Sequence, residues 1–211
     1  MGFIIHEKGI EIDPKRVEAM KRVEAPTCKK DLQKFLGKVN YLRRFIFNLS
    51  RKIDSFIPVL RLKDEAEFTW GAEQQESFEK IKNYLSSPPA LKAPKRGDPF
   101  RLYVAAEDKV IGIVLTQETE EKEYIITYLN RRLIDAETRY TFIEKLCLSL
   151  YYACTKLRHY LLSSTCIVTC QADVIKHMLQ KPILSGRIGK WAYALVEYDL
   201  AYDSLKSVKG Q

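Results

Sequence analysis

The side chains best suited to binding chemistry recur every four residues in one segment near the N-terminus. Two sets follow this spacing: a basic set, Lys30, Lys34 and Lys38, and a mixed set, Gln33, Gly37 and Tyr41. On a helix each set forms one stripe, and the two stripes lie side by side. Lysines at that spacing suit the phosphates of a nucleic acid. The alternative is an ordinary solvent-facing helix in which the glycine is incidental and costs about 1 kcal/mol relative to alanine.

Positive charge is concentrated around these stripes. The chain carries a formal net charge of +8. Residues 14–63 alone contain fourteen Lys or Arg and four Asp or Glu, a net charge of +10, so the remainder is slightly acidic. This asymmetry indicates a polyanionic partner for the N-terminal segment, while a solvated basic surface is the equally simple alternative.

Composition limits the classes of protein to which the chain can belong. Its 211 residues are 46% hydrophobic and 29% charged, enough to build one large or two small domains with real cores. No run of about 18 apolar residues and no signal-peptide pattern occurs, so we expect an intracellular protein, cytoplasmic or nuclear, that is neither secreted nor in a membrane. The five cysteines form no C-x-x-C pair, which disfavours a disulfide framework or a zinc site.

The N-terminal half predicts a hairpin followed by helices. Residues 3–12 alternate around a turn, and Asp13-Pro14 then provides a helix cap and first turn. Thr27 is the expected cap of the next helix, whose apolar positions recur at three- and four-residue spacing as far as Leu49. A run interrupted by Pro58 and a helix over 71–85 complete this half.

The C-terminal half shows a different pattern. Strand-like runs cover residues 100–105, 110–117 and 123–129, and a helix covers about 138–162. A strand at 165–170, helices at 173–180 and 186–197 and a strand at 198–204 follow. This order predicts an α/β domain whose sheet starts antiparallel and continues parallel.

Several ordered motifs resemble a known family. The sequence GFIIHEKGIEIDPKRVEAM at 2–20 resembles the end of a reverse transcriptase palm, and APTCKKDLQKFLGKVNYLRRFI at 25–46 resembles the thumb helix. The sequence FTWGAEQQESFEKIKNYLSSPPAL at 68–91 resembles the connecting segment. Four further motifs, AETRYTFIEK at 136–145, LRHYL at 157–161, SGRIGKWA at 185–192 and KGQ at 209–211, resemble a degenerate RNase H-like domain. Together they resemble the polyprotein of plant Gypsy-class LTR retrotransposons.

This resemblance implies an α+β chain with four segments. They are the end of the palm hairpin (1–12), a helical thumb and connection (13–87), a linker (88–99) and a catalytically degenerate RNase H-like domain with a mixed five-stranded sheet (100–211). Retroviral thumb helices place a glutamine, a glycine and an aromatic residue against the minor groove. By resemblance, Gln33 contacts base or sugar edges, Gly37 lets the backbone approach, and Tyr41 packs on sugars.

The resemblance also implies that the nuclease chemistry is missing. RNase H holds two Mg²⁺ ions on carboxylates around the scissile phosphate. The first three acids align with Ala105, Leu146 and Gln171, and the fourth aligns beyond the last residue. None of these side chains is an anion, so we expect no metal site and no cofactor, with Mg²⁺ bound only in an intact family member. We expect Leu146 to pack beside Ala105 and fill the former site.

Three nearby acids could in principle rebuild a metal site. Glu107 and Asp173 each lie two residues beyond an aligned position, which displaces them by about 6–7 Å along a strand. Glu144 lies two residues before Leu146, the second aligned position, and points elsewhere on a helix. We expect surface or capping roles for all three.

The sequence therefore favours a non-catalytic fragment of a retrotransposon reverse transcriptase/RNase H polyprotein. Its expected partners are an RNA–DNA hybrid or DNA duplex, bound weakly and without sequence preference, and the upstream palm and downstream RNase H and integrase modules. The polymerase aspartates of the family lie upstream of the aligned region, so the chain alone is not expected to be an enzyme. The alternatives are an active RNase H endonuclease and a domesticated interaction protein.

Overall fold

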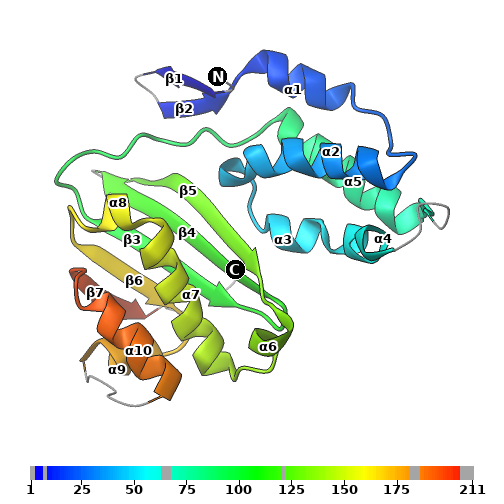
Figure 1. Cartoon of the computed structure of the whole chain (residues 1–211). Helices are drawn as coiled ribbons and strands as arrows, with labels where there is room; N and C mark the ends of the chain where they lie inside the picture. The colour runs from blue at the N-terminus through cyan, green and yellow to red at the C-terminus, as the bar shows by residue number, and fades with distance from the viewer. Residues whose placement is uncertain (1–2, 7–8, 63–67, 120–121, 181–185, 205–211) are drawn as a thin grey trace, which may run out of the picture. The chain divides into compact units, whose positions relative to one another are not determined.

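A computed structural model describes residues 3–6, 9–62, 68–119, 122–180 and 186–204. The chain divides into two compact units, Met1–Ala93 and Pro94–Gln211. Each unit is described by itself below, with the element labels of Figure 1.

The first unit combines a two-stranded hairpin with helices. In chain order its described elements are β1 (Phe3–His6), β2 (Gly9–Ile12), α1 (Pro14–Lys21), α2 (Lys29–Tyr41), η1 (Arg43–Phe45), α3 (Leu49–Lys52), η2 (Asp54–Phe56), α4 (Ile57–Arg61) and α5 (Ala72–Ser86). The strands pair antiparallel from Phe3 opposite Ile12 to His6 opposite Gly9. The hairpin predicted from residue alternation is thus present.

The two first helices begin in different ways. Asp13 caps α1 as predicted, because its Oδ1 accepts a hydrogen bond of 2.9 Å from the backbone N–H of Lys15, and Pro14 is the first helical residue. The predicted cap of α2 is wrong. Cys28 occupies the N-cap position, and the Thr27 hydroxyl instead donates to Asp31 at 3.2 Å.

Helix α2 ends at Tyr41, well before the apolar pattern does near Leu49. Leu42 leaves the helical conformation (φ −93°, ψ 6°), and a 3₁₀ turn follows. Asn48 then adopts a left-handed conformation (φ 51°) and starts the short helix α3. The apolar residues beyond Tyr41 are buried from separate short elements, which a single helical stripe could not describe.

Aromatic packing forms the core of the first unit. Phe35 of α2 lies 4.8 Å from Phe78 of α5 and 6.3 Å from Phe56, between ring centroids. Trp70 stacks on Phe56 at 5.6 Å. These rings fix the inward face of α2, and its opposite face is therefore left to solvent.

The hairpin is closed against the segment that follows α5. The Ile10 N–H donates to the Leu91 carbonyl at 2.6 Å, and the Leu91 N–H donates to the Ile10 carbonyl at 3.1 Å. Gly9 has φ 138°, and a Cβ at this residue would lie 2.1 Å from the Leu91 oxygen. Only glycine fits this approach. The stretch expected as a linker thus begins in contact with the hairpin, and the two units divide after Ala93.

The second unit is built on a mixed sheet. Its described elements are β3 (Phe100–Ala106), β4 (Val110–Thr119), β5 (Lys122–Arg132), α6 (Asp135–Thr138), α7 (Phe142–Lys156), α8 (Arg158–Leu161), β6 (Cys166–Cys170), α9 (Val174–Gln180), α10 (Gly186–Leu195) and β7 (Leu200–Ser204). The strand order is β5-β4-β3-β6-β7. The pairs β3–β4 and β4–β5 are antiparallel, whereas β3–β6 and β6–β7 are parallel, which confirms the predicted five-stranded mixed sheet.

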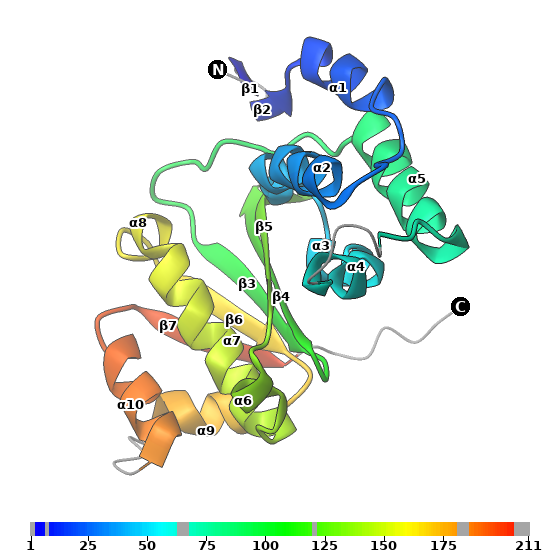
Figure 2. The ribbon, with the colours of Figure 1, turned by 45° about the vertical axis from the view of Figure 1, so that its right-hand side comes forward.

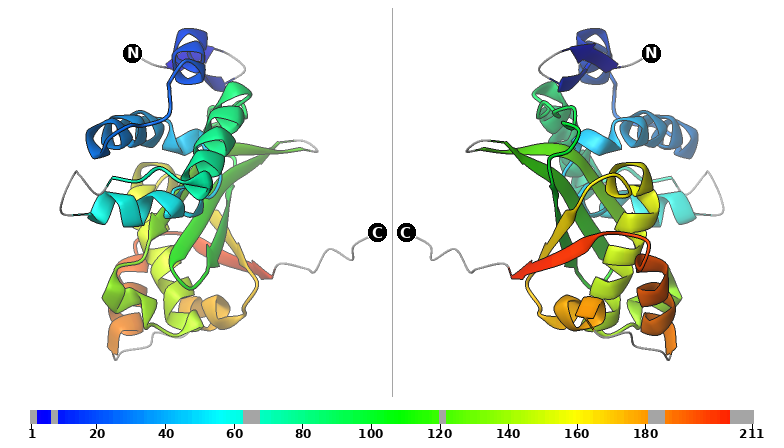
Figure 3. Two further views of the ribbon diagram at one scale, coloured as in Figure 1. Left: turned by 90° about the vertical axis from the view of Figure 1, so that its right-hand side faces the viewer. Right: turned by 90° about the vertical axis from the view of Figure 1, so that its left-hand side faces the viewer.

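Helix α7 lies across one face of this twisted sheet with α10 beside it (Figures 1 and 2; Figure 3 shows the twist of the strands). It starts at Phe142, four residues later than the pattern predicts, because Thr141 and Glu144 form a reciprocal capping box. It ends at Leu157, where the backbone leaves the helix before α8 begins. No helix in the described ranges is long and apolar enough to span a membrane.

One core cluster joins the sheet to α7. Strand β3 contributes alternate residues Phe100, Leu102 and Val104, and α7 contributes Leu146 and Leu150, all of them nearly inaccessible to solvent. The side chains between them on β3 face the other side of the sheet. Four cysteines are buried in the same cluster as free thiols.

Candidate nucleic-acid interface

The predicted stripe of Gln33, Gly37 and Tyr41 lies on α2 and faces solvent. Gln33 and Gly37 are exposed, and the side chain of Tyr41 is 44% exposed at the last residue of the helix. The inward face of α2 instead carries Leu32, Phe35 and Val39, each at most 1% exposed. The core therefore dictates which face α2 presents outward.

The lysine stripe is also exposed but is not uniformly charged. Lys34 pairs with Asp31, with Nζ and Oδ1 3.2 Å apart. The pKa of Asp31 is held below its usual range by hydrogen bonds from Cys28, then from Lys34 and Thr27. Lys30 and Lys38 form no ion pair within the described residues. Surface pairs of this kind contribute little stability, so Lys34 can exchange Asp31 for a phosphate at small cost.

Lys34 and Lys38 also line a small hollow of about 270 Å³. Its other walls are Asp31 and Phe35 of α2 and the loop between α1 and α2, including Glu24. The two lysines therefore border a recess that also has two carboxylates in its lining.

Tyr41 has contacts that the sequence did not predict. Its ring stacks on Phe3 of β1, with centroids 4.9 Å apart and planes 1° from parallel. The Arg16 guanidinium of α1 lies 4.6 Å from the centre of the Tyr41 ring. Tyr41 thus joins α2 to the hairpin and to α1, which reduces the ring area left for sugars. Phe3 and the basic window are visible in the sequence, but nothing in their spacing links them to Tyr41.

Gly37 provides a test of the minor-groove interpretation. A Cβ at this residue would meet nothing within 4 Å, so the protein itself does not require glycine there. Gly37→Ala should raise the free energy of unfolding by about 1 kcal/mol through helix propensity. If nucleic acid approaches the backbone there, the same change should weaken binding several-fold. Chemical denaturation and fluorescence anisotropy with a duplex measure the two effects.

The control is Asn83→Ala, an exposed substitution on α5 that also raises helix propensity. It should stabilise without changing duplex affinity. Equal or tighter binding by the Gly37→Ala protein would exclude close approach at this residue.

Two of the three positions that the resemblance aligns with acids, Ala105 and Gln171, lie at neighbouring strands of the sheet. β3 and β6 pair in parallel from Phe100 opposite Cys166 to Tyr103 opposite Thr169. Ala105 lies two residues beyond the last residue of β3 that pairs with β6, and Gln171 directly follows β6. Both are exposed and lie near the carboxyl ends of neighbouring parallel strands.

Leu146 does not join them. It is 1% exposed and packs in the core with Leu102 and Val104, whereas Ala105 has the opposite parity on β3 and faces away from that core. The expectation that Leu146 packs beside Ala105 is therefore wrong. The Leu146 side chain belongs to the core between α7 and the sheet.

The nearby acids serve structural roles. Glu144 Oε2 accepts from the backbone N–H of Thr141 at 2.9 Å, and Oε1 accepts from Arg187 at 2.7 Å. The first of these hydrogen bonds is the main cause that lowers the pKa of Glu144. The Tyr202 hydroxyl donates to Asp173 at 2.9 Å, and burial followed by this bond raises the pKa of Tyr202. Glu107 closes the β3–β4 turn through its backbone N–H, which donates to Val110 at 2.8 Å.

The residues at the former acid positions do not fit a pair of divalent cations. A methyl group and a buried isobutyl group offer no lone pair, and the Gln171 amide oxygen is a single neutral ligand. Within the described ranges, no group of three His, Cys, Asp or Glu residues is placed to hold a metal ion. The acids that would be needed are absent from these positions.

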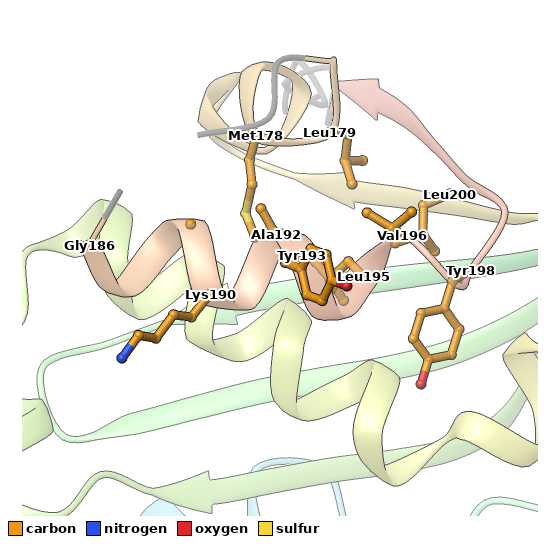
Figure 4. A pocket seen from close by; sticks show the side chains of 11 residues that line it. Met178, Leu179, Gly186, Lys190, Ala192, Tyr193, Leu195, Val196, Tyr198 and Leu200 are labelled. Carbon is orange, nitrogen blue, oxygen red and sulfur yellow. The ribbon is translucent and has the colours of Figure 1, made fainter. Parts of the chain in front are cut away.

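A larger hollow of about 730 Å³ lies between α9, α10 and the start of β7 (Figure 4). Its lining is mostly apolar, including Met178, Leu195 and Leu200, and Lys190 is its one charged residue among those described. The Tyr198 hydroxyl at its edge already donates to the Cys154 carbonyl. Among the described residues, this lining contains no carboxylate or imidazole.

The mixed sheet with α7 across it defines a ribonuclease H-like domain. Residues 70–168 match the family of RNase H-like domains found in reverse transcriptase. The retrovirus-related Pol polyprotein of transposon 297 from Drosophila melanogaster is 29% identical over 208 residues, covering 98% of this chain and 19% of that polyprotein. The transposon Tf2-3 polyprotein of Schizosaccharomyces pombe is 30% identical over 165 residues, covering 78% of this chain and 12% of the polyprotein.

Over most of its length the chain is thus similar to a region of retrotransposon and retrovirus-related polyproteins, and residues 70–168 match an RNase H-like family of reverse transcriptases. It spans about a fifth or less of the length of these curated relatives. The relatives come from an insect and a yeast, and the plant Gypsy-class origin predicted from the motifs stays a prediction.

Solved structures share the fold. The foamy viral protease–reverse transcriptase dRH in complex with double-stranded DNA superposes with a TM-score of 0.82 at 18% identity, covering 100% of this chain and 38% of that one. The foamy viral protease–reverse transcriptase in complex with an RNA/DNA hybrid gives a TM-score of 0.82 at 20% identity, covering 99% and 29%. At this identity the likeness establishes the fold alone.

Proposed function

We propose that this chain is a non-catalytic, duplex-binding part of a retrotransposon reverse transcriptase. The single observation that carries the loss of catalysis is Leu146, which stands at an aligned acid position and is 1% exposed in an apolar core. A carboxylate could be held there only with a compensating metal or partner. With Ala105 and Gln171 at the other two positions, the second unit keeps the fold and supplies no metal ligands.

The first unit is the proposed duplex grip. Support comes from the outward stripe of α2, the exposed lysines beside it and the net charge of +10 over residues 14–63. The two foamy viral structures hold double-stranded DNA and an RNA/DNA hybrid, which are the partners we propose here. Binding should be weak and independent of sequence, because phosphate contacts carry no base information.

The second unit is the proposed connection. It would tether and space an upstream palm and downstream RNase H and integrase modules of the polyprotein. The motifs at 136–145 and 185–192 support the further proposal of a plant Gypsy-class source.

The test of the catalytic part is a cleavage assay. The purified chain should leave an end-labelled RNA–DNA hybrid intact in Mg²⁺ and in Mn²⁺, because three of its ligand positions carry no charge. An active RNase H in the same buffer is the positive control. Cleavage that disappears in Glu107→Ala or Asp173→Ala protein would overturn the proposal and identify a rebuilt site.

A further inference from the structure

Four side chains from four elements of the first unit form one continuous stack. Its centre is the pair of Phe3 and Tyr41, whose rings lie parallel at 4.9 Å. Arg16 lies 4.6 Å from the centre of the Tyr41 ring, and Arg44 lies 5.9 Å from the centre of the Phe3 ring. Both distances are within the range of a cation–π contact. The stack links β1, α1, α2 and η1.

The two guanidinium groups in this stack lack acidic partners. Within the described part of the chain, neither Arg16 nor Arg44 forms an ion pair, whereas the neighbouring Arg22 pairs with Glu18 at 3.2 Å. An arginine beside an aromatic ring still has N–H groups available to other partners. These two arginines therefore have donors that can bind a ligand.

Guanidinium groups without an acidic partner suit one ligand chemistry in particular. A planar guanidinium donates two parallel hydrogen bonds to a phosphate, and such charge-assisted pairs are stronger than neutral ones. Because the rings already restrict these long side chains, less conformational entropy is lost when a phosphate binds. The strongly basic surroundings of the stack favour an anion further.

We propose that Arg16 and Arg44, held by the rings of Tyr41 and Phe3, form a second phosphodiester-binding element beside the lysine stripe. This proposal rests on the proposed duplex-binding function and adds a site to it. Tyr41 is then a positioning residue for Arg16 and for the hairpin, in place of the direct sugar contact expected from the motif. Phe3 has the corresponding role for Arg44.

The test compares the salt dependence of duplex binding among charge-matched variants. The double variant Arg16→Ala, Arg44→Ala should lower the slope of log K against log salt by about 1.8, which is about 0.9 for each lost phosphate contact. The double variant Arg16→Lys, Arg44→Lys keeps the charge, so its slope should stay near that of the parent. Its affinity should still fall, by roughly three- to tenfold, because lysine cannot donate the paired hydrogen bonds.

The matched control is Lys21→Ala, Arg61→Ala, which removes two exposed cations of the same unit outside the stack. It should lower the slope of log K against log salt by less than half of the decrease expected for the Arg16→Ala, Arg44→Ala variant. A second pair tests the rings: Tyr41→Phe should bind like the parent, and Tyr41→Leu should bind as weakly as the double lysine variant. Circular dichroism of every variant checks that the helices remain.

The outcomes separate the two proposals. If the parent binds a duplex and loses slope when the lysine stripe is removed, but the arginine and Tyr41 variants behave like the parent, the stack proposal alone is overturned. If Tyr41→Phe weakens binding as much as Tyr41→Leu, the ring is not acting as a platform, and the positioning role is overturned. A parent chain that fails to bind any duplex would overturn both proposals.

Discussion

Replacing Leu146 by Glu should unfold much of the second unit under conditions in which Ala105→Asp leaves it intact. Leu146 is 1% exposed among apolar side chains, and the neighbouring buried cation, Lys145, already donates to the Asp108 carbonyl at 2.9 Å. Burial of a carboxylate without a partner is among the few single changes that cost more than about 4 kcal/mol. Ala105 is exposed, so its substitution should change stability by about 0.5 kcal/mol or less. Thermal and urea unfolding followed by circular dichroism measure both.

The pH dependence of this effect has a defined sign. Burial would raise the pKa of the new carboxyl above its value of about 4.3 in the unfolded chain. The folded state then binds more protons than the unfolded state between these two pKa values, so the variant loses stability as pH rises through that window. Leu146→Gln, which is neutral, should lack this additional dependence.

Restoring all three acids, Ala105→Asp, Leu146→Glu and Gln171→Asp, should not produce a variant that Mg²⁺ stabilises. Residues 105 and 171 lie at one exposed edge of the sheet, but residue 146 belongs to the core on the other side of β3. A ligand stabilises a protein only if it binds the folded state. Recovery of stability by Mg²⁺, or a Leu146→Glu protein as stable as the parent, would contradict the placement of Leu146.

Removing the lysine stripe should cause the largest loss of nucleic-acid affinity. The triple variant Lys30→Ala, Lys34→Ala, Lys38→Ala should lower the salt slope by up to about 2.7, since each phosphate contact contributes about 0.9. The same relation predicts a loss of up to several hundredfold in affinity at about 0.1 M salt. The Asp31–Lys34 pair makes the loss from Lys34 the smallest of the three, because part of that charge is already neutralised.

The control for this result removes three exposed lysines from the second unit: Lys109→Ala, Lys176→Ala, Lys190→Ala. Like the triple variant of α2, this control removes three positive charges. Parallel slopes for the parent and the α2 variant would show that the lysine stripe does not contact phosphates. Equal losses in both triple variants would show that overall charge, rather than the α2 surface, determines binding.

Sequence patterns predicted the elements better than their ends. The hairpin, the cap at Asp13 and the sheet that starts antiparallel and continues parallel depend on local chemistry and alternation, and the structure has them. Thr27 was a wrong cap because α2 starts one residue later than expected, with Cys28 in an extended conformation at the N-cap, and the Thr27 hydroxyl donates to Asp31. The length of α2 was overestimated because periodicity continues across Leu42, where the backbone turns.

The errors in the candidate site arise from contacts between elements. The stack of Phe3 and Tyr41 joins residues far apart in sequence, so helical spacing alone could not find it. The placement of Leu146 depends on the parity of β3, where a shift of one residue moves a side chain to the other face of the sheet. An alignment by motif gives the position of a residue along the chain but not the face on which it lies.

The most direct measurement of the central claim is a titration of an end-labelled RNA–DNA hybrid with the parent chain over a salt series in Mg²⁺. In each sample, fluorescence anisotropy measures binding. A denaturing gel of the same sample measures the length of both strands. We predict binding that weakens linearly in log K with log salt, together with full-length RNA at every protein concentration. Absence of binding at low salt, or metal-dependent shortening of the RNA strand, would contradict a non-catalytic duplex-binding region.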